Sequence, residues 1–388
     1  MQTQSRSIYL PLLTAGHFLS DFYANFLPAL LPLVIASLHL SLTSSGVLVM
    51  VFSAASNILQ PICGFYLDKT GKTTFILLTL PLSAFFICTV NYISSYSMLL
   101  LALLFSGVAS SFFHPLASLL LSKVTKEKSK NLSMSIFIAG GNFGFAFAPA
   151  IIIYFLLVFG FSSLPWLMVP GFLLTALYLS CGVHKIDIKT HQTPIATATK
   201  KRPWYTSPDL LKLNLAMGLR AWPQVAIPTF LPIFLAQKGL TSTDSGHLLT
   251  VFLVGGAVGG LIGGYMGDRF GRKISTVAAL ALCLPASYFF ITASEITALT
   301  WICLAISGAT LQSPLPSSIT WAQELLPENG AMASGMMLGL AFGLGGLGAA
   351  LTGYLADLTS LKQAFTLTLF ALPSAIACTM LIHSKPRN

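Results

Sequence analysis

The sequence predicts an all-α membrane protein with twelve transmembrane helices in two pseudo-symmetric bundles of six, both termini being cytoplasmic. Three observations support this fold class: the composition, the length of the apolar blocks and an internal repeat. Of the 388 residues, 55% are hydrophobic and only 8% are charged, and the mean hydropathy is +0.79. Soluble proteins carry about 25% charged residues, so the composition excludes an ordinary soluble domain.

Twelve apolar blocks are long enough to cross a bilayer, which takes about 20 helical residues. Blocks 1, 4, 7 and 10 differ from the others because His, Asp, Asn, Arg, Gln or Pro interrupts them. In chain order the blocks are 8–38, 44–66, 73–93, 96–121, 132–158, 163–183, 208–237, 243–265, 273–292, 296–322, 330–355 and 361–383.

The basic residues predict the orientation of these helices. The formal net charge is +10, and 17 of the 21 Lys and Arg residues lie in the N-terminus, the C-terminal tail and the even-numbered loops. The odd-numbered loops hold only Lys238 and Lys362. Because basic loops stay on the cytoplasmic side, this asymmetry predicts that both termini are cytoplasmic. The positive charge is then explained by membrane orientation, without binding of nucleic acid.

One polar segment interrupts the apolar blocks at the middle of the chain. Residues 184–207 are rich in Lys, Thr and Pro. Such a composition is typical of a linker. We therefore predict an N-terminal six-helix bundle over 1–183, a cytoplasmic linker over 184–207 and a C-terminal bundle over 208–388.

The two halves align at a constant offset of 200 residues. The nonapeptide Gly64 to Lys72, GFYLDKTGK, matches Gly264 to Arg272, GYMGDRFGR. A parallel repeat of six helices predicts two bundles with a substrate path between them. Further matching positions are Pro28 and Pro228, Pro32 and Pro232, Thr43 and Thr243, Ser45 and Ser245, and Gly46 and Gly246.

These motifs identify a resemblance to the major facilitator superfamily over the whole chain. Its loop motif G-x-x-x-D-[RK]-x-G-[RK] occurs after blocks 2 and 8. The resemblance implies that the acidic and basic residues of the motif hold the two halves together on the cytoplasmic side. The residues that it assigns to this gate are Gly64, Asp68, Gly71, Gly264, Asp268, Arg269, Gly271 and Arg272.

A narrower resemblance concerns three segments, GHFLSDFYANFLPALLP in block 1, SSFFHPLAS in block 4 and GGNFGFAFAP in block 5. They are similar to the fosmidomycin-resistance branch of the superfamily, whose members are proton-driven exporters. This resemblance implies export, although block 5 lacks the proline that directly follows the second glycine in the usual antiporter motif.

Ionisable side chains within the membrane predict the functional site. His17, Asp21 and Asn25 share one stripe of the first helix, and Arg220 lies next to the position that corresponds to Asp21. Asp21 and Arg220 should lie at a similar depth, roughly 18–20 Å from the cytoplasmic side. Because charges in the bilayer are costly, the two side chains are expected to face a central cavity and either a substrate or each other.

We predict proton coupling by Asp21, His17 and His114, the last of which precedes a helix-breaking proline. An alternative for each histidine is a neutral hydrogen-bonded role. The predicted substrate-binding residues, whose alternative is hydrogen bonding between helices or interfacial anchoring, are Arg220, Asn25, Asn142, Gln224, Gln312 and Trp222.

The sequence thus predicts a monomeric secondary transporter in the inner membrane, exchanging protons against a small anionic or zwitterionic compound such as a drug, metabolite or siderophore. Import of an anionic nutrient or metal chelate fits the residues equally well. A receptor or a lipid-handling enzyme is a third reading, but no nucleophile–base pair or metal cluster supports it. No cofactor, metal or nucleic acid is expected.

Overall fold

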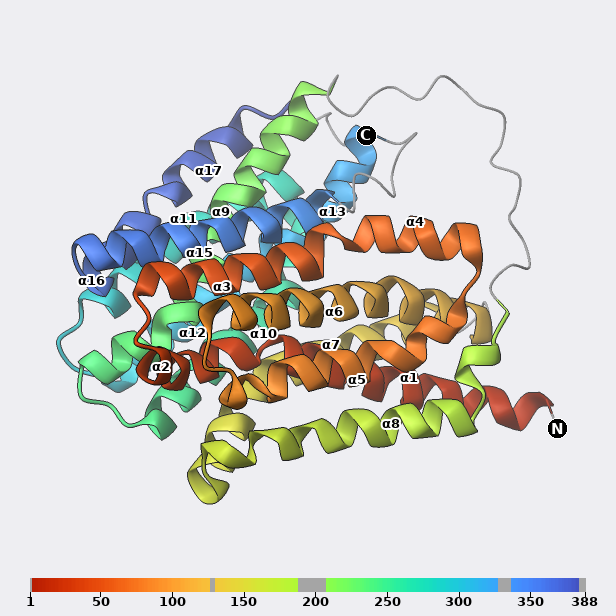
Figure 1. The fold of residues 1–388 in the computed structure, drawn as a ribbon. Helices are drawn as coiled ribbons and strands as arrows, with labels where there is room; N and C mark the ends of the chain where they lie inside the picture. Colours follow the sequence, from red (N-terminus) through yellow and green to blue (C-terminus); the bar gives the residue numbers. More distant parts are fainter. Residues whose placement is uncertain (1, 126–129, 188–206, 327–335, 384–388) are drawn as a thin grey trace. The chain divides into compact units, whose positions relative to one another are not determined.

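The computed structural model describes residues 2–125, 130–187, 207–326 and 336–383, and these residues are almost entirely helical (Figure 1). The chain divides into two compact units. The first contains residues 1–38 and 54–197, and the second contains 39–53 and 198–388. Most of the predicted linker, 188–206, lies outside the described residues.

The first unit is built from long helices and short connecting turns, several of them 3₁₀. Its elements are α1 (Gln2–Ala24), α2 (Phe26–Leu38), η1 (Ala54–Ile58), α4 (Gln60–Thr70), η2 (Thr73–Phe75), α5 (Ile76–Cys88), η3 (Val90–Tyr92), α6 (Tyr96–Val124), α7 (Lys130–Phe159), η5 (Phe161–Met168), α8 (Val169–Ser180) and η6 (Val183–Lys185).

The second unit contains the remaining helices. They are α3 (Leu42–Ser53), α9 (Pro208–Gln237), α10 (Ser242–Phe270), α11 (Arg272–Thr292), α12 (Ala298–Gln312), α13 (Pro314–Leu325), η9 (Met336–Leu340), α15 (Ala341–Leu358), α16 (Leu361–Thr368) and α17 (Ala371–Met380).

Ten helical stretches in the described residues are long and apolar enough to cross a membrane. They correspond to all the predicted blocks except 208–237, which forms the more polar α9, and 330–355, part of which lies outside the described residues. The multi-pass fold is therefore confirmed, whereas the number twelve and the cytoplasmic termini stay predictions.

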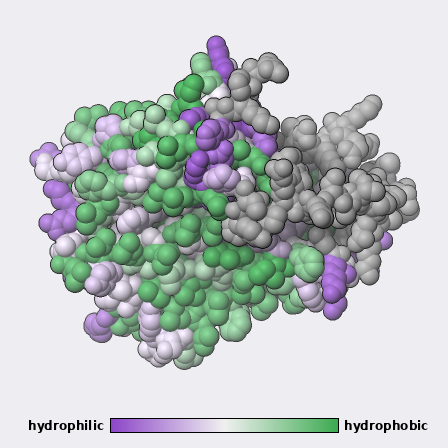
Figure 2. All heavy atoms as spheres, turned by 90° about the horizontal axis from the view of Figure 1, so that it is seen from above, coloured by the Kyte–Doolittle hydropathy of each residue, from purple (hydrophilic) through white to green (hydrophobic). Residues whose placement is uncertain are grey.

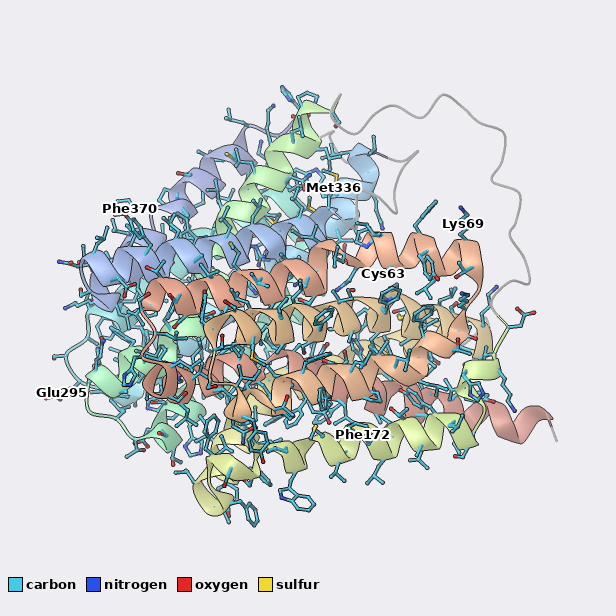
Figure 3. The ribbon with its side chains drawn as sticks, in the orientation of Figure 1. Cys63, Lys69, Phe172, Glu295, Met336 and Phe370 are labelled. Carbon is cyan, nitrogen blue, oxygen red and sulfur yellow. The ribbon has the colours of Figure 1, made fainter. Side chains whose placement is uncertain are left out.

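The outward-facing side chains suit a lipid environment. Phe172 of α8 and Phe370, which follows α16, are both exposed, and both are labelled in Figure 3. The face drawn in Figure 2 is largely hydrophobic, with hydrophilic side chains gathered in separate patches. Apolar side chains can remain exposed at no cost where they contact lipid tails.

The predicted block 44–66 forms one helical stretch whose two halves belong to different units. A π-helical turn, η1, lies at the boundary, and α3 packs on α15 of the second unit. Glycines allow this close approach, since a Cβ on Gly46 would lie 2.6 Å from Ala350 Cα. The Asp357 carboxylate accepts hydrogen bonds from Leu42 N at 2.9 Å and from Thr43 N at 2.7 Å.

The internal repeat has a counterpart in the packing of each unit. A Cβ added to Gly64 would lie 3.7 Å from Pro115, and one added to Gly264 would lie 3.8 Å from Pro316. The first glycine of each motif copy therefore faces a proline of an equivalent later helix. The division at 184–207 that the repeat suggested stays a prediction, and 39–53 groups with the second unit.

Candidate functional site

Three ionisable side chains come together between α1 and α6 in the first unit, and we call them the His–Asp–His cluster: His17, Asp21 and His114. Asp21 Oδ2 lies 3.4 Å from His17 Nε2, and Asp21 Oδ1 lies 3.5 Å from His114 Nε2. Each oxygen of the one carboxylate thus faces a different imidazole. The three side chains are only 11–24% exposed, so water screens them weakly.

The position of His17 is determined by α7. Its Nδ1 lies 2.7 Å from the carbonyl oxygen of Phe137, and its ring stacks on the Phe137 ring with centroids 4.1 Å apart. Since a carbonyl can only accept, Nδ1 must carry hydrogen and donate. The other ring nitrogen, Nε2, is therefore the one presented to Asp21.

The cluster fits only because residue 141 has no side chain. A Cβ on Gly141 of α7 would lie 2.5 Å from both Asp21 Oδ2 and His17 Nε2. The sequence analysis did not single out Gly141, whose lack of a side chain leaves room for the cluster. The sequence signal that could have indicated it is the pair of glycines in GGNFG, which served above only as part of the family resemblance.

The same cluster is where the described part of the chain could hold a metal ion. One ligand atom from each of the three side chains lies within 4.8 Å of the others. Two imidazoles and a carboxylate are ligand types that suit several divalent metals.

Arg220 of α9 is fully buried in the second unit. Its Nη1 donates to Gln224 Oε1 and to the carbonyl oxygen of Leu311. Its Nε and Nη2 are also buried, and in the described residues they have no hydrogen-bond partner. These two nitrogens form one edge of the guanidinium plane, and an oxyanion can bind that edge through two oxygens.

The predicted polar residues of the second unit gather around Arg220. Gln224 accepts a hydrogen bond from Arg220 Nη1 and donates one from its Nε2 to Gln312 Oε1. The second of these hydrogen bonds links α9 to α12. Trp222, two residues from Arg220, donates from Nε1 to Thr352 Oγ1 of α15 at 2.8 Å. Three of the predicted residues therefore form one hydrogen-bonded chain, and Trp222 faces a different helix.

The predicted residues Asn25 and Asn142 are not part of the cluster. Asn25 lies at the junction of α1 and α2 and donates from Nδ2 to the Phe145 carbonyl at 2.8 Å, so it joins two helices. Asn142 is exposed on α7. Asp21 and Arg220 belong to different units, so their predicted pairing stays a prediction.

The second glycine has a positive φ in both copies of the predicted gate motif, but the turns differ, since ψ is 21° at Gly71 and 140° at Gly271. Gly71 ends α4 with φ of 64°, and Gly271 lies between α10 and α11 with φ of 89°. Both values are in the region that favours glycine. Asp268 lies in the last turn of α10, whereas the side chain of Asp68 is outside the described residues.

The basic residues of the second copy have partners within their own unit. Arg269 donates to the Tyr265 hydroxyl at 2.9 Å, and Arg272 forms an ion pair with Glu324 of α13. Lys69 of the first copy lies near the end of α4 (Figure 3).

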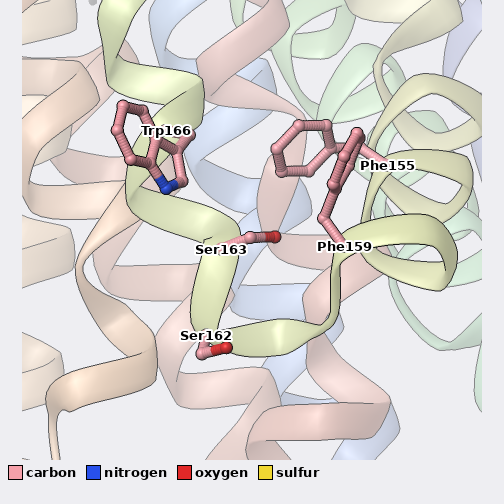
Figure 4. A pocket seen from close by; sticks show the side chains of 5 residues that line it. All are labelled: Phe155, Phe159, Ser162, Ser163 and Trp166. Atoms are coloured by element: carbon pink, nitrogen blue, oxygen red, sulfur yellow. The ribbon is translucent and has the colours of Figure 1, made fainter.

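None of these residues lines the surface hollow drawn in Figure 4. It measures about 490 Å³ at the turn between α7 and η5. Its lining is aromatic and hydroxylic and contains no ionisable side chain: Phe155, Phe159, Ser162, Ser163 and Trp166. It therefore has the character of an aromatic interfacial position and not of a transport site.

Comparisons with known proteins agree with this architecture. The family model described as Major Facilitator Superfamily matches residues 13–329 and 213–388. The fosmidomycin resistance protein of Escherichia coli (strain K12) is 28% identical, covering 95% of this chain and 91% of its own length. An uncharacterised MFS-type transporter of Bacillus subtilis (strain 168), YfnC, is also 28% identical, covering 93% of this chain and 90% of its own length.

Solved structures show the same fold. A bacterial homologue of the human lysosomal transporter Spinster has a TM-score of 0.80 with 16% identity, covering 98% of this chain and 97% of its own. The nucleoside transporter NupG has a TM-score of 0.72 with 16% identity, covering 96% of this chain and 98% of its own.

Proposed function

Because the chain belongs to the Major Facilitator Superfamily, a family of transporters and not of enzymes, we propose that it works by alternating access and couples proton movement to a small anionic or zwitterionic compound. It would act as a monomer in a bacterial inner membrane, with both termini cytoplasmic. The observation that carries the coupling is the His–Asp–His cluster.

The donors and acceptors of the cluster favour a shared proton between Asp21 and His17. Since His17 Nδ1 donates to Phe137, its Nε2 in the neutral ring is an acceptor, and it faces a carboxylate oxygen that also only accepts. A proton on either Asp21 or His17 converts this repulsive contact into a favourable one. His114 offers a second base on the other oxygen of Asp21.

Arg220 supports an anionic group on the substrate. A buried cation without a counter-charge is costly, and the guanidinium has two buried donors without a partner in the described residues. A bound oxyanion would satisfy both donors. We propose that Gln224, Gln312 and Trp222 position Arg220 and the substrate, and that Asn25 and Asn142 contribute from the first unit.

Export is the direction that the relatives support, since a fosmidomycin resistance protein shares 28% identity over most of the chain. Import of an anionic nutrient or metal chelate is the second candidate, because Arg220 would bind an anion in either direction. In both cases the motif residues Asp68, Asp268, Arg269 and Arg272 would close the cytoplasmic side.

The coupling is tested with purified protein in liposomes, using Asp21→Asn and a chelator so that metal ions cannot replace the proton. We expect wild type to accumulate an anionic substrate when a pH gradient is imposed, and the variant to lose this accumulation while still exchanging substrate across the membrane without a gradient. Gradient-driven accumulation by Asp21→Asn equal to that of wild type would exclude Asp21.

Substrate binding and direction are tested separately. Fosmidomycin and other small anions are screened for thermal stabilisation of wild type and of Arg220→Ala. An anion that stabilises both equally does not bind Arg220. Accumulation in everted vesicles indicates export, and accumulation in right-side-out vesicles indicates import.

A further inference from the structure

A second group of basic side chains lies at the C-terminal end of α17, far along the chain from the His–Asp–His cluster. This helix packs against both α9 and α11. Lys212 of α9 donates from Nζ to the Leu381 carbonyl at 3.0 Å, and Lys273 of α11 donates to the Ile382 carbonyl at 3.0 Å. The two lysines thus approach the last turn of α17 from either side.

A cavity of about 510 Å³ lies at this place. Both lysines and the end of α17 line it, and its lining residues are Lys212, Lys273, Met380, Leu381, Ile382 and His383. The lining of the cavity therefore combines basic and apolar side chains.

Each lysine has ammonium protons that no hydrogen bond in the described residues uses. An ammonium group has three protons to donate. Lys212 uses two of them, on Leu381 and on Asp209 Oδ1 at 2.9 Å, and Lys273 uses one. Asp209 pairs with Lys212 and lies 3.3 Å from His383 Nδ1, whereas Lys273 has no ion pair among the described residues.

The apolar side chains around the cavity favour a lipid as its ligand. Apolar side chains close in sequence to the two lysines and to the end of α17 are exposed: Ile274 next to Lys273 is 66% exposed, Leu215 of α9 is 52% exposed, and Leu381, which lines the cavity, is 65% exposed. A soluble anion would not cover this apolar surface, whereas acyl chains would. On the predicted orientation the lysines face the leaflet that carries anionic lipids.

We propose that the cavity bounded by Lys212, Lys273 and the end of α17 binds the head group of an anionic phospholipid, with its acyl chains lying along the exposed apolar side chains of α9, α11 and α17. The lipid phosphate accepts the remaining lysine protons. The site is independent of the transport cycle proposed above, because it needs only the membrane-spanning fold.

The experiment compares binding of phosphatidylglycerol and phosphatidylcholine to the purified full-length chain by native mass spectrometry. The test variant is Lys212→Gln with Lys273→Gln. The matched control is Lys238→Gln at the other end of α9, since Lys238 also donates to a backbone carbonyl, that of Ala293. Arg at both positions, Lys212→Arg with Lys273→Arg, checks that the fold tolerates substitution.

We expect wild type and the Lys238→Gln control to prefer phosphatidylglycerol, and the double Gln variant to bind it about 30-fold more weakly, from the usual contribution of two basic side chains at an anionic lipid surface. The double Arg variant should retain binding. Equal affinity of wild type for the two lipids would overturn the proposal, as would unchanged binding by the double Gln variant.

Two further outcomes also contradict it. If the double Gln variant loses thermal stability equally in both lipids, the lysines act only as caps of α17. If soluble glycerol phosphate binds wild type as tightly as the lipid does, the ligand is a free anion and the apolar surface has no part in binding.

Discussion

Adding one methyl group at Gly141 should disable the His–Asp–His cluster while leaving all its ionisable side chains present. The new Cβ of Gly141→Ala would lie 2.5 Å from Asp21 Oδ2 and from His17 Nε2, against 3.4 Å for an ordinary contact. The carboxylate or the imidazole must therefore move by about 0.9 Å. Overpacking of this size costs about 1–3 kcal/mol of stability.

The functional loss should exceed what this destabilisation explains. A misplacement of about 1 Å costs on the order of 10²-fold in sites that depend on geometry. We expect proton-driven transport by Gly141→Ala in liposomes to fall about tenfold to 100-fold, with exchange in the absence of a pH gradient less affected.

A neighbouring glycine provides the matched control. A Cβ on Gly140, on the same helix, would meet Thr14 Cγ2 at 2.5 Å and not the cluster. Gly140→Ala should therefore lose similar stability but keep its pH dependence. Because residues that act as a unit are not additive, Gly141→Ala should add little to Asp21→Asn. Wild-type pH dependence in Gly141→Ala, at wild-type stability, would refute the reasoning.

Three further predictions concern stability. Tyr23→Phe should lower the free energy of unfolding, measured by denaturation in micelles, by about 0.6–1.7 kcal/mol. The buried hydroxyl donates to the Leu167 carbonyl and accepts from the Gly171 N–H, each at 3.0 Å, and Phe can do neither. An unchanged denaturation midpoint would mean that water replaces the hydroxyl. Burial opposes ionisation of Asp357, but hydrogen bonds from α3 outweigh burial and hold the pKa of this carboxyl below its usual value. The ionised carboxylate therefore stabilises the fold fully above about pH 3.9, the usual pKa of Asp in an unfolded chain. This stabilisation is lost as the pH falls through the lower pKa of the folded protein. Asp357→Asn should therefore melt earlier than wild type at neutral pH, the difference shrinking in acid, and a pH-independent difference would contradict this. Gly259→Ala should unfold more easily than Gly260→Ala. A Cβ at position 259 would lie 2.0 Å from the Ala309 carbonyl oxygen, whereas one at position 260 meets only the flexible side chain of Gln312 at 3.5 Å. Equal melting temperatures of the two variants would show that α12 can shift.

Much of the cluster could be predicted from the sequence because its signals are local. His17 and Asp21 are four residues apart on one helix, and His114 is an ionisable residue within another apolar block, directly before a proline. The structure brings all three together. An ionisable residue in an apolar block is visible without any knowledge of its neighbours.

Gly141 and the partners of Arg220 could not be predicted in the same way. The need for glycine depends on how closely α7 approaches α1, and a glycine in an apolar helix is equally consistent with ordinary close packing. The Leu311 carbonyl that accepts from Arg220 lies in the last turn of α12, and its contact with α9 depends on how the two helices pack.

The association of 39–53 with the second unit was also beyond sequence reasoning. Residues 44–66 read as one apolar block, and the polar Ser56 and Asn57 of the π-helical turn Ala54–Ile58 are too few to divide it. The division depends on which helix covers each half of the block, and that is a property of packing between residues distant in the chain.

The pairing of α3 with α15 has a consequence for biosynthesis. Leu42 and its partner Asp357 are 315 positions apart, so α3 is among the first segments made and its partner among the last. At about 5–20 residues per second, roughly 15–60 s separate their synthesis. During that time the side of α3 that α15 later covers has no such partner, and the second unit cannot complete its packing until nearly the whole chain has been synthesised.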